Sequence, residues 1–215
     1  MPPATRTRPD TMFRKLTLVL ATSLLLAGAT HTAAQATTLI DTGTPDNSLF
    51  AGTVDSSNFL ALQFSAAQAW RIDGIAAFLA GGQAGEHFAL SLYRDATNHL
   101  PGDLIASTAL SFVADGWNGA AALGWYLPTA GVYWLGVEGV DGSFNAPGGG
   151  LVMPGSTAFA DGSHLGAYQA YNGLQFGLRM TGAVPEPASI ALLLAGLVAM
   201  AMATAASAKV RRSPR

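Results

Sequence analysis

The stretch Leu174–Thr181 (LQFGLRMT) alternates apolar residues with polar or small ones more regularly than any other part of the chain. Its leucine, phenylalanine and methionine side chains point one way, and the residues between them point the other. A period of two is the side-chain repeat of a β-strand with one buried face. The stretch therefore predicts a strand near the end of a folded domain.

Similar runs recur upstream, separated by turns rich in Gly, Pro, Asp and Asn. In such turns glycine supplies positive φ and proline presets the turn entry. A helical period of useful length is missing between residues 37 and 182, so we predict one all-β domain over 37–182. We expect about eight to ten strands in two packed sheets, a jelly-roll-like β-sandwich. The predicted strands lie within 60–64, 70–79, 88–93, 104–112, 123–127, 132–137 and 174–181, and 144–152 is predicted to be a loop.

Beyond this domain the chain ends in three parts: Pro185-Glu186-Pro187, an uncharged run from Ala188 to Ala208, and a basic end. The run has 21 residues. At about 1.5 Å per residue, a helix of this length matches the roughly 30 Å hydrocarbon core of a bilayer. The cations after it favour a cytoplasmic location for that end. They are Lys209, Arg211, Arg212 and Arg215. We therefore predict a single transmembrane helix over 188–208, with the domain on the far side of the membrane.

A Pro-Glu-Pro turn, an apolar helix and an arginine cluster in this order resemble a PEP-CTERM sorting signal. The resemblance covers residues 183–215 and implies export across the inner membrane of a Gram-negative, often biofilm-forming, bacterium. It also implies an exosortase, a membrane transpeptidase that cuts near Pro185-Glu186-Pro187 and transfers the product to a surface anchor. The alternative is an ordinary C-terminal membrane anchor after a proline-rich turn.

The other end of the chain carries a second targeting signal. A basic pair precedes 14 apolar residues, Leu16–Ala29, and Ala34-Gln35-Ala36 has the small-x-small pattern of a signal-peptidase site. The apolar run is short for a membrane span, which favours cleavage. Residues 1–36 are therefore predicted to be a secretory signal peptide, cut after Ala36 on the Sec-type export route. Met12 is a candidate start of translation.

The predicted domain is far more acidic than the chain as a whole, whose net charge is −2. Between residues 37 and 187 three arginines stand against twelve carboxylates, a net charge of −9. Phosphate backbones repel such a domain, which argues against a nucleic-acid partner. The chain has no cysteine, which excludes disulfides, thiolate chemistry and cysteine-ligated metals.

The domain itself has a second resemblance. Phe88–Tyr93 (FALSLY), Leu100–Leu104 (LPGDL) and Pro128–Leu135 (PTAGVYWL) are similar to the ordered LxLY strand, PG turn and AGxYWL strand of choice-of-anchor domains. Those domains are β-sandwiches that occur with several surface anchors, and their biochemical function is mostly unassigned. The resemblance implies a fold and no catalytic residues.

No catalytic or metal motif stands in the sequence. HExxH and HxH pairs, a GxSxG elbow and a DxDxDG loop are all absent, so we predict no catalytic residues, no metal and no cofactor. Three alternatives stay open: a triad assembled in space, a Ca²⁺ bridge between loops, and a glycosidase carboxylate facing a cleft. Their residues are Ser163 or Ser143 with His164 and Asp161 for the triad, Asp95, Asp103 or Asp115 for Ca²⁺, and Glu138 for the glycosidase.

Carbohydrate binding is the alternative to a purely structural role, because β-sandwiches often bind sugars through exposed aromatic rings. Trp117, Tyr168 and Tyr171 lie in Gly-rich, polar stretches and are the candidate ligand-binding residues. The other tryptophans, Trp70, Trp125 and Trp134, lie within predicted strands and are assigned to the core.

Two functional hypotheses follow. The first is an exported, non-enzymatic cell-surface or matrix protein associated with exopolysaccharide in a biofilm. The second is a surface carbohydrate-binding module or weak glycan hydrolase with its site in the sandwich loops.

Overall fold

The computed structural model describes residues 37–162, 167–184 and 195–198. Within 37–162 and 167–184 the structure has twelve strands, and every strand pair described there is antiparallel. The strands are β1 (Thr37–Asp41), β2 (Leu49–Val54), β3 (Phe59–Ala66), β4 (Trp70–Leu79), β5 (His87–Asp95), β6 (Pro101–Ser111), β7 (Gly116–Leu127), β8 (Gly131–Gly139), β9 (Phe144–Gly148), β10 (Thr157–Ala160), β11 (Gln169–Tyr171) and β12 (Leu178–Ala183).

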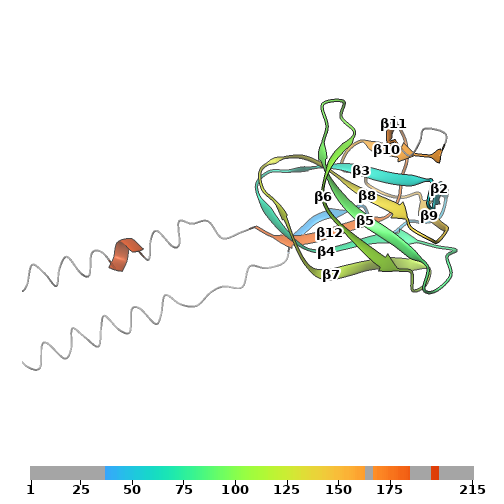
Figure 1. Cartoon of the computed structure of the whole chain (residues 1–215), viewed down its shortest axis with the longest axis horizontal. Helices are drawn as coiled ribbons and strands as arrows, with labels where there is room; N and C mark the ends of the chain where they lie inside the picture. Colours follow the sequence, from blue (N-terminus) through green and yellow to red (C-terminus); the bar gives the residue numbers. More distant parts are fainter. Residues whose placement is uncertain (1–36, 163–166, 185–194, 199–215) are drawn as a thin grey trace, which may run out of the picture. The chain divides into compact units, whose positions relative to one another are not determined.

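The strands form a sandwich of two main sheets (Figure 1). One sheet has the order β1-β12-β4-β7, the other has the order β11-β10-β3-β8-β5-β6, and β2 pairs with β9 in a small third sheet. Leaving aside β2, β9, β10 and β11, the chain passes between the two main sheets in the order of a jelly roll. The prediction of an all-β fold is confirmed.

The core lies between the inner faces of the two main sheets. Leu60, Leu62 and Phe64 of β3 are at most 2% exposed and pack with the inward residues of β5, β8 and β12. Each apolar side chain of this size contributes about 1.5–3 kcal/mol when it leaves water completely. The alternation seen in the sequence therefore correctly identified the buried face of these strands.

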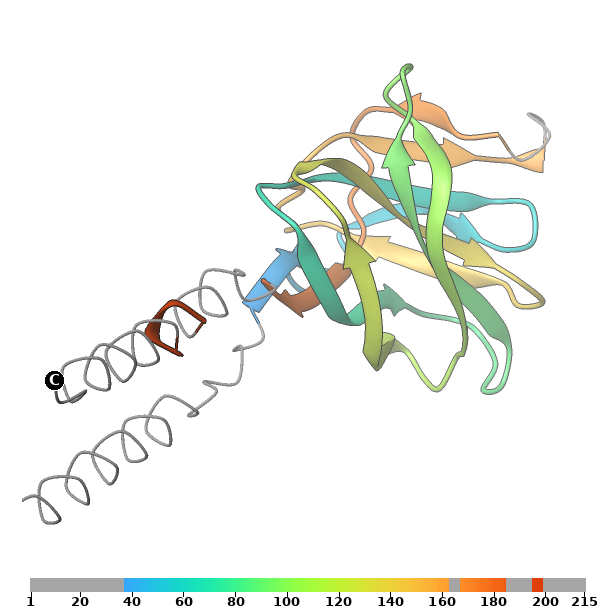
Figure 2. The same ribbon diagram turned by 60° about the vertical axis from the view of Figure 1, so that its left-hand side comes forward.

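The last strand, β12, is a central one. Met180 pairs with Ile40 of β1 on one side and with Ile75 of β4 on the other. Figure 2 shows β1 and β12 side by side, with the start of β1 next to the end of β12. Because β12 has a neighbour on each side, the four-stranded sheet is complete only when β12 is in place.

The ladder of β12 begins later than the alternation at 174–181 predicts. Upstream of Leu178, the carbonyl of Phe176 accepts a hydrogen bond from the Thr42 hydroxyl at 3.3 Å. The carbonyl of Gly177 accepts one from the Phe78 amide at 2.9 Å. Leu174 and Phe176 are buried as predicted, but a threonine side chain replaces part of the strand pairing.

The small β2–β9 sheet closes one end of the sandwich. β9 lies in the stretch 144–152 that was predicted to be a loop, and that prediction is wrong for residues 144–148. Phe144 is 1% exposed, with ring centroids 5.7 Å from Phe88 and 5.3 Å from Phe112. Gly142 packs so closely against the Phe144 ring that a Cβ there would overlap it.

The predicted targeting segments fall almost entirely outside the described residues. Nothing is described for the signal peptide over 1–36, and within 188–208 only residues 195–198 are described, as a single helical turn. In the part of the chain that the structure covers, no helix has the length and apolar character needed to cross a membrane.

Replacing Phe144 by alanine tests whether this end of the sandwich is a true part of the core. We expect Phe144→Ala to lower the free energy of unfolding by about 3–5 kcal/mol, because it leaves a cavity between two aromatic rings. Urea unfolding of residues 37–184 measures the change. Val113→Ala, at a side chain that is 75% exposed, is the control, with a change within about 0.5 kcal/mol. Equal effects of the two substitutions would contradict the packing described.

Candidate functional site

Trp117, the first candidate sugar-binding residue, lies within β7 and not in a loop. Its ring meets the Phe78 ring edge-on, with centroids 5.5 Å apart. The guanidinium carbon of Arg179 lies 3.9 Å from the centroid of the Trp117 ring, a cation–π contact. Arg179, from β12 of the same sheet, therefore covers one face of the Trp117 ring. A ligand-binding role for Trp117 stays a prediction.

Tyr168, the second candidate, belongs to a hydroxyl–carboxylate cluster on the outer face of the six-stranded sheet. The cluster consists of Ser91, Tyr93, Ser107, Glu138 and Tyr168. One oxygen of Glu138 accepts hydrogen bonds from the hydroxyls of Tyr93 and Tyr168, the latter at 3.1 Å. The other oxygen accepts one from Ser91 at 2.9 Å, and Ser91 in turn lies 2.9 Å from the hydroxyl of Ser107.

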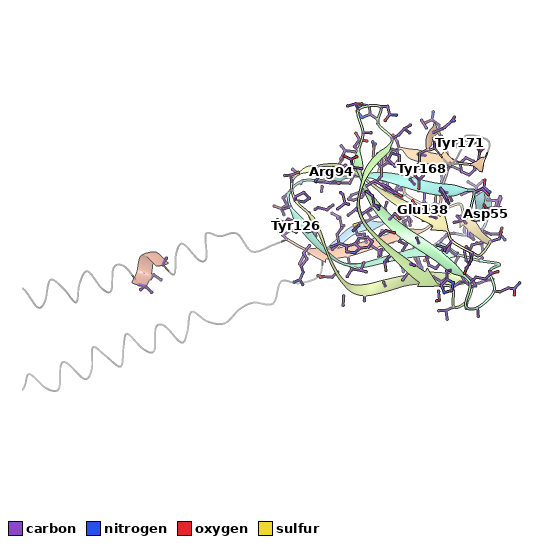
Figure 3. The ribbon with its side chains drawn as sticks, in the orientation of Figure 1. Asp55, Arg94, Tyr126, Glu138, Tyr168 and Tyr171 are labelled. Carbon is purple, nitrogen blue, oxygen red and sulfur yellow. The ribbon has the colours of Figure 1, made fainter. Side chains whose placement is uncertain are left out.

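The register of β5 and β8 explains why these groups meet. Ala89 pairs with Glu138 and Ser91 pairs with Gly136, so serine and glutamate are diagonal neighbours on one face. Gly136 leaves the space that Tyr168 uses, since a Cβ there would lie 2.9 Å from the Tyr168 hydroxyl. Figure 3 shows Tyr168 and Glu138 close together over the sheet.

The cluster holds both phenols in their neutral form. Burial, the hydrogen bond to Glu138 and the charge of Glu138 all raise the pKa of Tyr93 well above its usual value. Burial and the Glu138 charge raise the pKa of Tyr168 in the same way. Glu138, considered above as a glycosidase carboxylate, uses both oxygens in hydrogen bonds to the fold.

A second carboxylate, Asp95, anchors a small core on the same outer face. Trp134 is fully buried there with Ala61 and Ala158, covered in part by Tyr93 and Tyr168. The Trp134 indole N–H donates to Asp95 at 2.7 Å. Trp134 is thus buried as predicted, but on the outer face of its sheet.

The pKa of Asp95 reflects two opposing effects. Burial raises the pKa of this carboxyl, but hydrogen bonds from Trp134, His99 and Gln63 outweigh burial and leave the pKa below its usual value. His99 lies 3.0 Å from one Asp95 oxygen and the Gln63 amide lies 3.2 Å from the other. Asp95 therefore remains an acceptor for the indole at neutral pH.

Tyr171, the third candidate, differs from the other two because its side chain is 53% exposed. It ends β11, the edge strand of the six-stranded sheet. A pocket of about 190 Å³ lies beside it, lined by Met153, Gly155, Ser156, Thr157, Asn172, Gly173, Leu174 and Gln175. The structure thus places Tyr168 and Tyr171 in different surroundings although they are three residues apart.

The candidate triad stays a prediction, and the described candidates for metal binding are not brought together. Ser163 and His164 lie outside the described residues. Asp115 accepts a hydrogen bond from the Gly81 amide at 2.7 Å, and Asp95 is engaged with Trp134. Across the described ranges, no three His, Asp or Glu side chains gather in a way that could hold a metal ion.

In the sequence, the predicted targeting residues directly precede and follow the described sandwich. The predicted sorting residues Pro185-Glu186-Pro187 and the predicted cleavage residues Ala34 and Ala36 lie outside the described part of the chain, as do the C-terminal cations. Val184, which packs against the core, is the one residue between β12 and Pro185. Thr37, directly after the predicted signal-peptide cut, pairs with Gly182.

The raised pKa values of Tyr93 and Tyr168 predict a specific alkaline behaviour. In the folded protein two of the five tyrosines should ionise only well above pH 10, the ordinary tyrosine pKa, as followed by phenolate absorbance. Their contribution to stability is complete below the unfolded pKa and is lost as pH rises from there toward the folded pKa. Glu138→Gln should lower the ionisation pH of both phenols, and exposed Asp103→Asn should leave it unchanged. Five tyrosines titrating together near pH 10 would refute the cluster.

Asp95 offers a test of the small outer core. Asp95→Ala should lower the free energy of unfolding by about 1–3 kcal/mol, because the buried Trp134 N–H loses its acceptor. Asp95→Asn keeps an acceptor oxygen and should cost clearly less. Chemical denaturation of both variants beside Asp103→Ala measures the difference, and equal values for all three would rule out the anchoring role.

Comparison with known proteins identifies only the end of the chain. No curated protein matches the sequence. Two structures of infectious bursal disease virus show weak similarity. The VP2 subviral particle is 14% identical, covering 72% of this chain and 42% of that chain, with a TM-score of 0.26. The Gx strain structure is 10% identical, covering 72% and 41%, with a TM-score of 0.25. This chain thus spans less than half of either viral chain, and similarity at this level supports no conclusion.

The family comparison concerns the segment that follows β12. The model of the PEP-CTERM protein-sorting motif matches residues 183–212. This range contains Pro185-Glu186-Pro187, the apolar run and three of the four C-terminal cations. The prediction from the sequence is confirmed: the protein carries a PEP-CTERM protein-sorting motif at its C-terminal end.

Proposed function

We propose that the protein is an exported, non-enzymatic β-sandwich displayed at the cell surface or in the extracellular matrix. The observation that carries the proposal is the sorting motif at 183–212, which implies export, a membrane-anchored C-terminal signal and an exosortase as processing partner. The exosortase acts near Pro185-Glu186-Pro187 and releases the sandwich from its membrane helix. In this proposal the domain is a non-enzymatic protein component of the polysaccharide layer of a biofilm.

The position of the motif relative to the fold supports this processing. β12 ends at Ala183, where the motif match begins, so the sandwich and the signal meet with almost no linker. At the other end, β1 begins at Thr37, directly after the predicted signal-peptide cut. Two cuts, after Ala36 and near Pro185, would remove both targeting segments and leave all twelve strands intact.

The pairing of β12 also limits where the exosortase cuts. β12 exchanges hydrogen bonds with β1 and β4 up to Gly182 and Ala183. A cut before Ala183 would take away part of a central strand and expose buried backbone groups, which is costly. Val184 also packs against the core, so the processed chain is expected to end at or beyond Val184.

A second candidate function is binding of extracellular carbohydrate. The observation that favours it is the half-exposed Tyr171 beside a pocket. The non-enzymatic reading draws support from Glu138 and Asp95, which serve as acceptors within the fold. In this form of the proposal the domain holds matrix polysaccharide and performs no hydrolysis.

Intact-mass analysis of protein from the cell surface and the medium tests the sorting. We expect the wild-type chain to begin at Thr37 and to end between Val184 and Pro187. A variant with alanine at positions 185, 186 and 187 should keep its C-terminus at Arg215 and stay in the membrane fraction. Ser189→Ala, a neutral change in the apolar run, is the matched control and should be processed like the wild type. A wild-type protein that ends at Arg215 in producing cells would leave only a plain membrane anchor.

A further inference from the structure

The pocket next to Tyr171 is small and lies between two segments of the chain. Residues 153–157 form one wall and residues 172–175 form the other. Its volume of about 190 Å³ is below the roughly 300–1,000 Å³ of pockets that bind drug-sized ligands. The space suits a single small unit of a larger molecule.

The lining of the pocket carries no charge and combines polar groups with a larger share of apolar surface. Ser156, Thr157, Asn172 and Gln175 provide hydroxyl and amide groups, and Met153 and Leu174 provide apolar surface. Hydroxyls and amides both donate and accept hydrogen bonds, as the hydroxyl groups of a neutral sugar require. A carboxylate or phosphate ligand would find no lining cation, and it would enter a domain (residues 37–182) with a net charge of −8, three arginines against eleven carboxylates.

Tyr171 stands on the same side of the sheet as the pocket. Thr157 lines the pocket and pairs directly with Tyr171 in the β10–β11 ladder. Directly opposed side chains in an antiparallel pair point to the same face, with Cβ atoms about 4.5–5.5 Å apart. Figure 3 shows Tyr171 at the margin of the sandwich, and about half of this residue is exposed.

The walls of the pocket are fixed to the sandwich. The backbone N–H of Gln63, on β3, donates a hydrogen bond to the Ser156 carbonyl at 2.8 Å. The Thr157 hydroxyl donates to the Tyr171 carbonyl. Gly155 packs against the Gln63 carbonyl so closely that a Cβ would overlap it. These contacts hold the 153–157 wall in place before a ligand arrives, which lowers the cost of binding.

From these observations we propose that the pocket binds one unit of a neutral polysaccharide. The Tyr171 ring packs against the apolar face of a sugar, and Asn172, Gln175 and Ser156 hydrogen-bond to its hydroxyl groups. This proposal rests on the proposed function in one respect, namely that sorting brings the protein to a polysaccharide layer. The binding itself does not require that the chain be sorted.

Titration calorimetry on the full-length chain tests the proposal. The chain is purified in a zwitterionic detergent without a sugar headgroup and titrated with hexasaccharides of glucose, mannose and galactose. Hexasaccharides of uronic acids are the charged counterparts. We expect at least one neutral series to bind with a Kd in the millimolar range or below, and the uronic-acid series to bind about tenfold more weakly or not at all.

Three substitutions locate the binding site. Tyr171→Ala should weaken binding of the neutral sugar about tenfold, and Asn172→Ala should weaken it several-fold. Both residues are exposed, so far-UV circular dichroism should show an unchanged fold. Tyr126→Ala is the matched control, because Tyr126 is 50% exposed on β7 of the other sheet, and it should bind like the wild type.

The outcomes separate this inference from the proposed function. No detectable binding of any neutral hexasaccharide at about 10 mM sugar, or equal binding by wild type and Tyr171→Ala, would overturn the pocket assignment. Tighter binding of the uronic-acid series would do the same. Correct C-terminal processing with no sugar binding would remove this inference alone, whereas sugar binding by a chain that is never processed would remove only the sorting proposal.

Discussion

The pairing of β12 with β1 on one side and β4 on the other is the constraint on which the sandwich depends. The strand that comes last in the chain occupies a central place, between the first strand and a strand from the middle. Its inward residues Leu178 and Met180 are fully buried, so both its backbone and its side chains are needed to complete the fold. A domain built in this way closes only after its C-terminal end is available. This fits a chain whose targeting signal follows directly after β12.

The six-stranded sheet shows how an acidic domain places carboxylates on a partly covered surface. Burying a carboxylate is costly unless hydrogen bonds replace its water. Glu138 receives hydrogen bonds from Ser91, Tyr93 and Tyr168, and Asp95 receives them from Trp134 and Gln63. Within the described residues, every buried side-chain nitrogen and oxygen has a hydrogen-bond partner. The two acids therefore hold the outer layer of the sheet in place.

The sequence predicted the features that depend on neighbouring residues. Alternation identified the buried faces of β3, β5 and β12, and the order of Pro-Glu-Pro, apolar run and cations identified the sorting motif. Features that depend on the order of strands in a sheet could not be predicted from the sequence. Ser91, Glu138 and Tyr168 are far apart in the chain and meet only because β5 lies beside β8. Trp117 was selected from a Gly-rich, polar stretch, yet it lies within β7, where Gly119 pairs with Ala76 of β4 so closely that a Cβ would overlap the Ile75 carbonyl.

The three aromatic residues selected from the sequence show why exposure has to be read from the fold. All three lie in Gly-rich, polar stretches, so composition treats them alike. In the sandwich, Arg179 covers Trp117, and Glu138 receives the hydroxyl of Tyr168. Tyr171 lies three residues further along the chain, on an edge strand that has only one neighbour, and half of its surface remains exposed. An aromatic ring can recognise a ligand only if the fold leaves one of its faces uncovered. Of the three candidate rings, Tyr171 at an edge of the six-stranded sheet therefore has the exposure that the proposed recognition of a ligand requires.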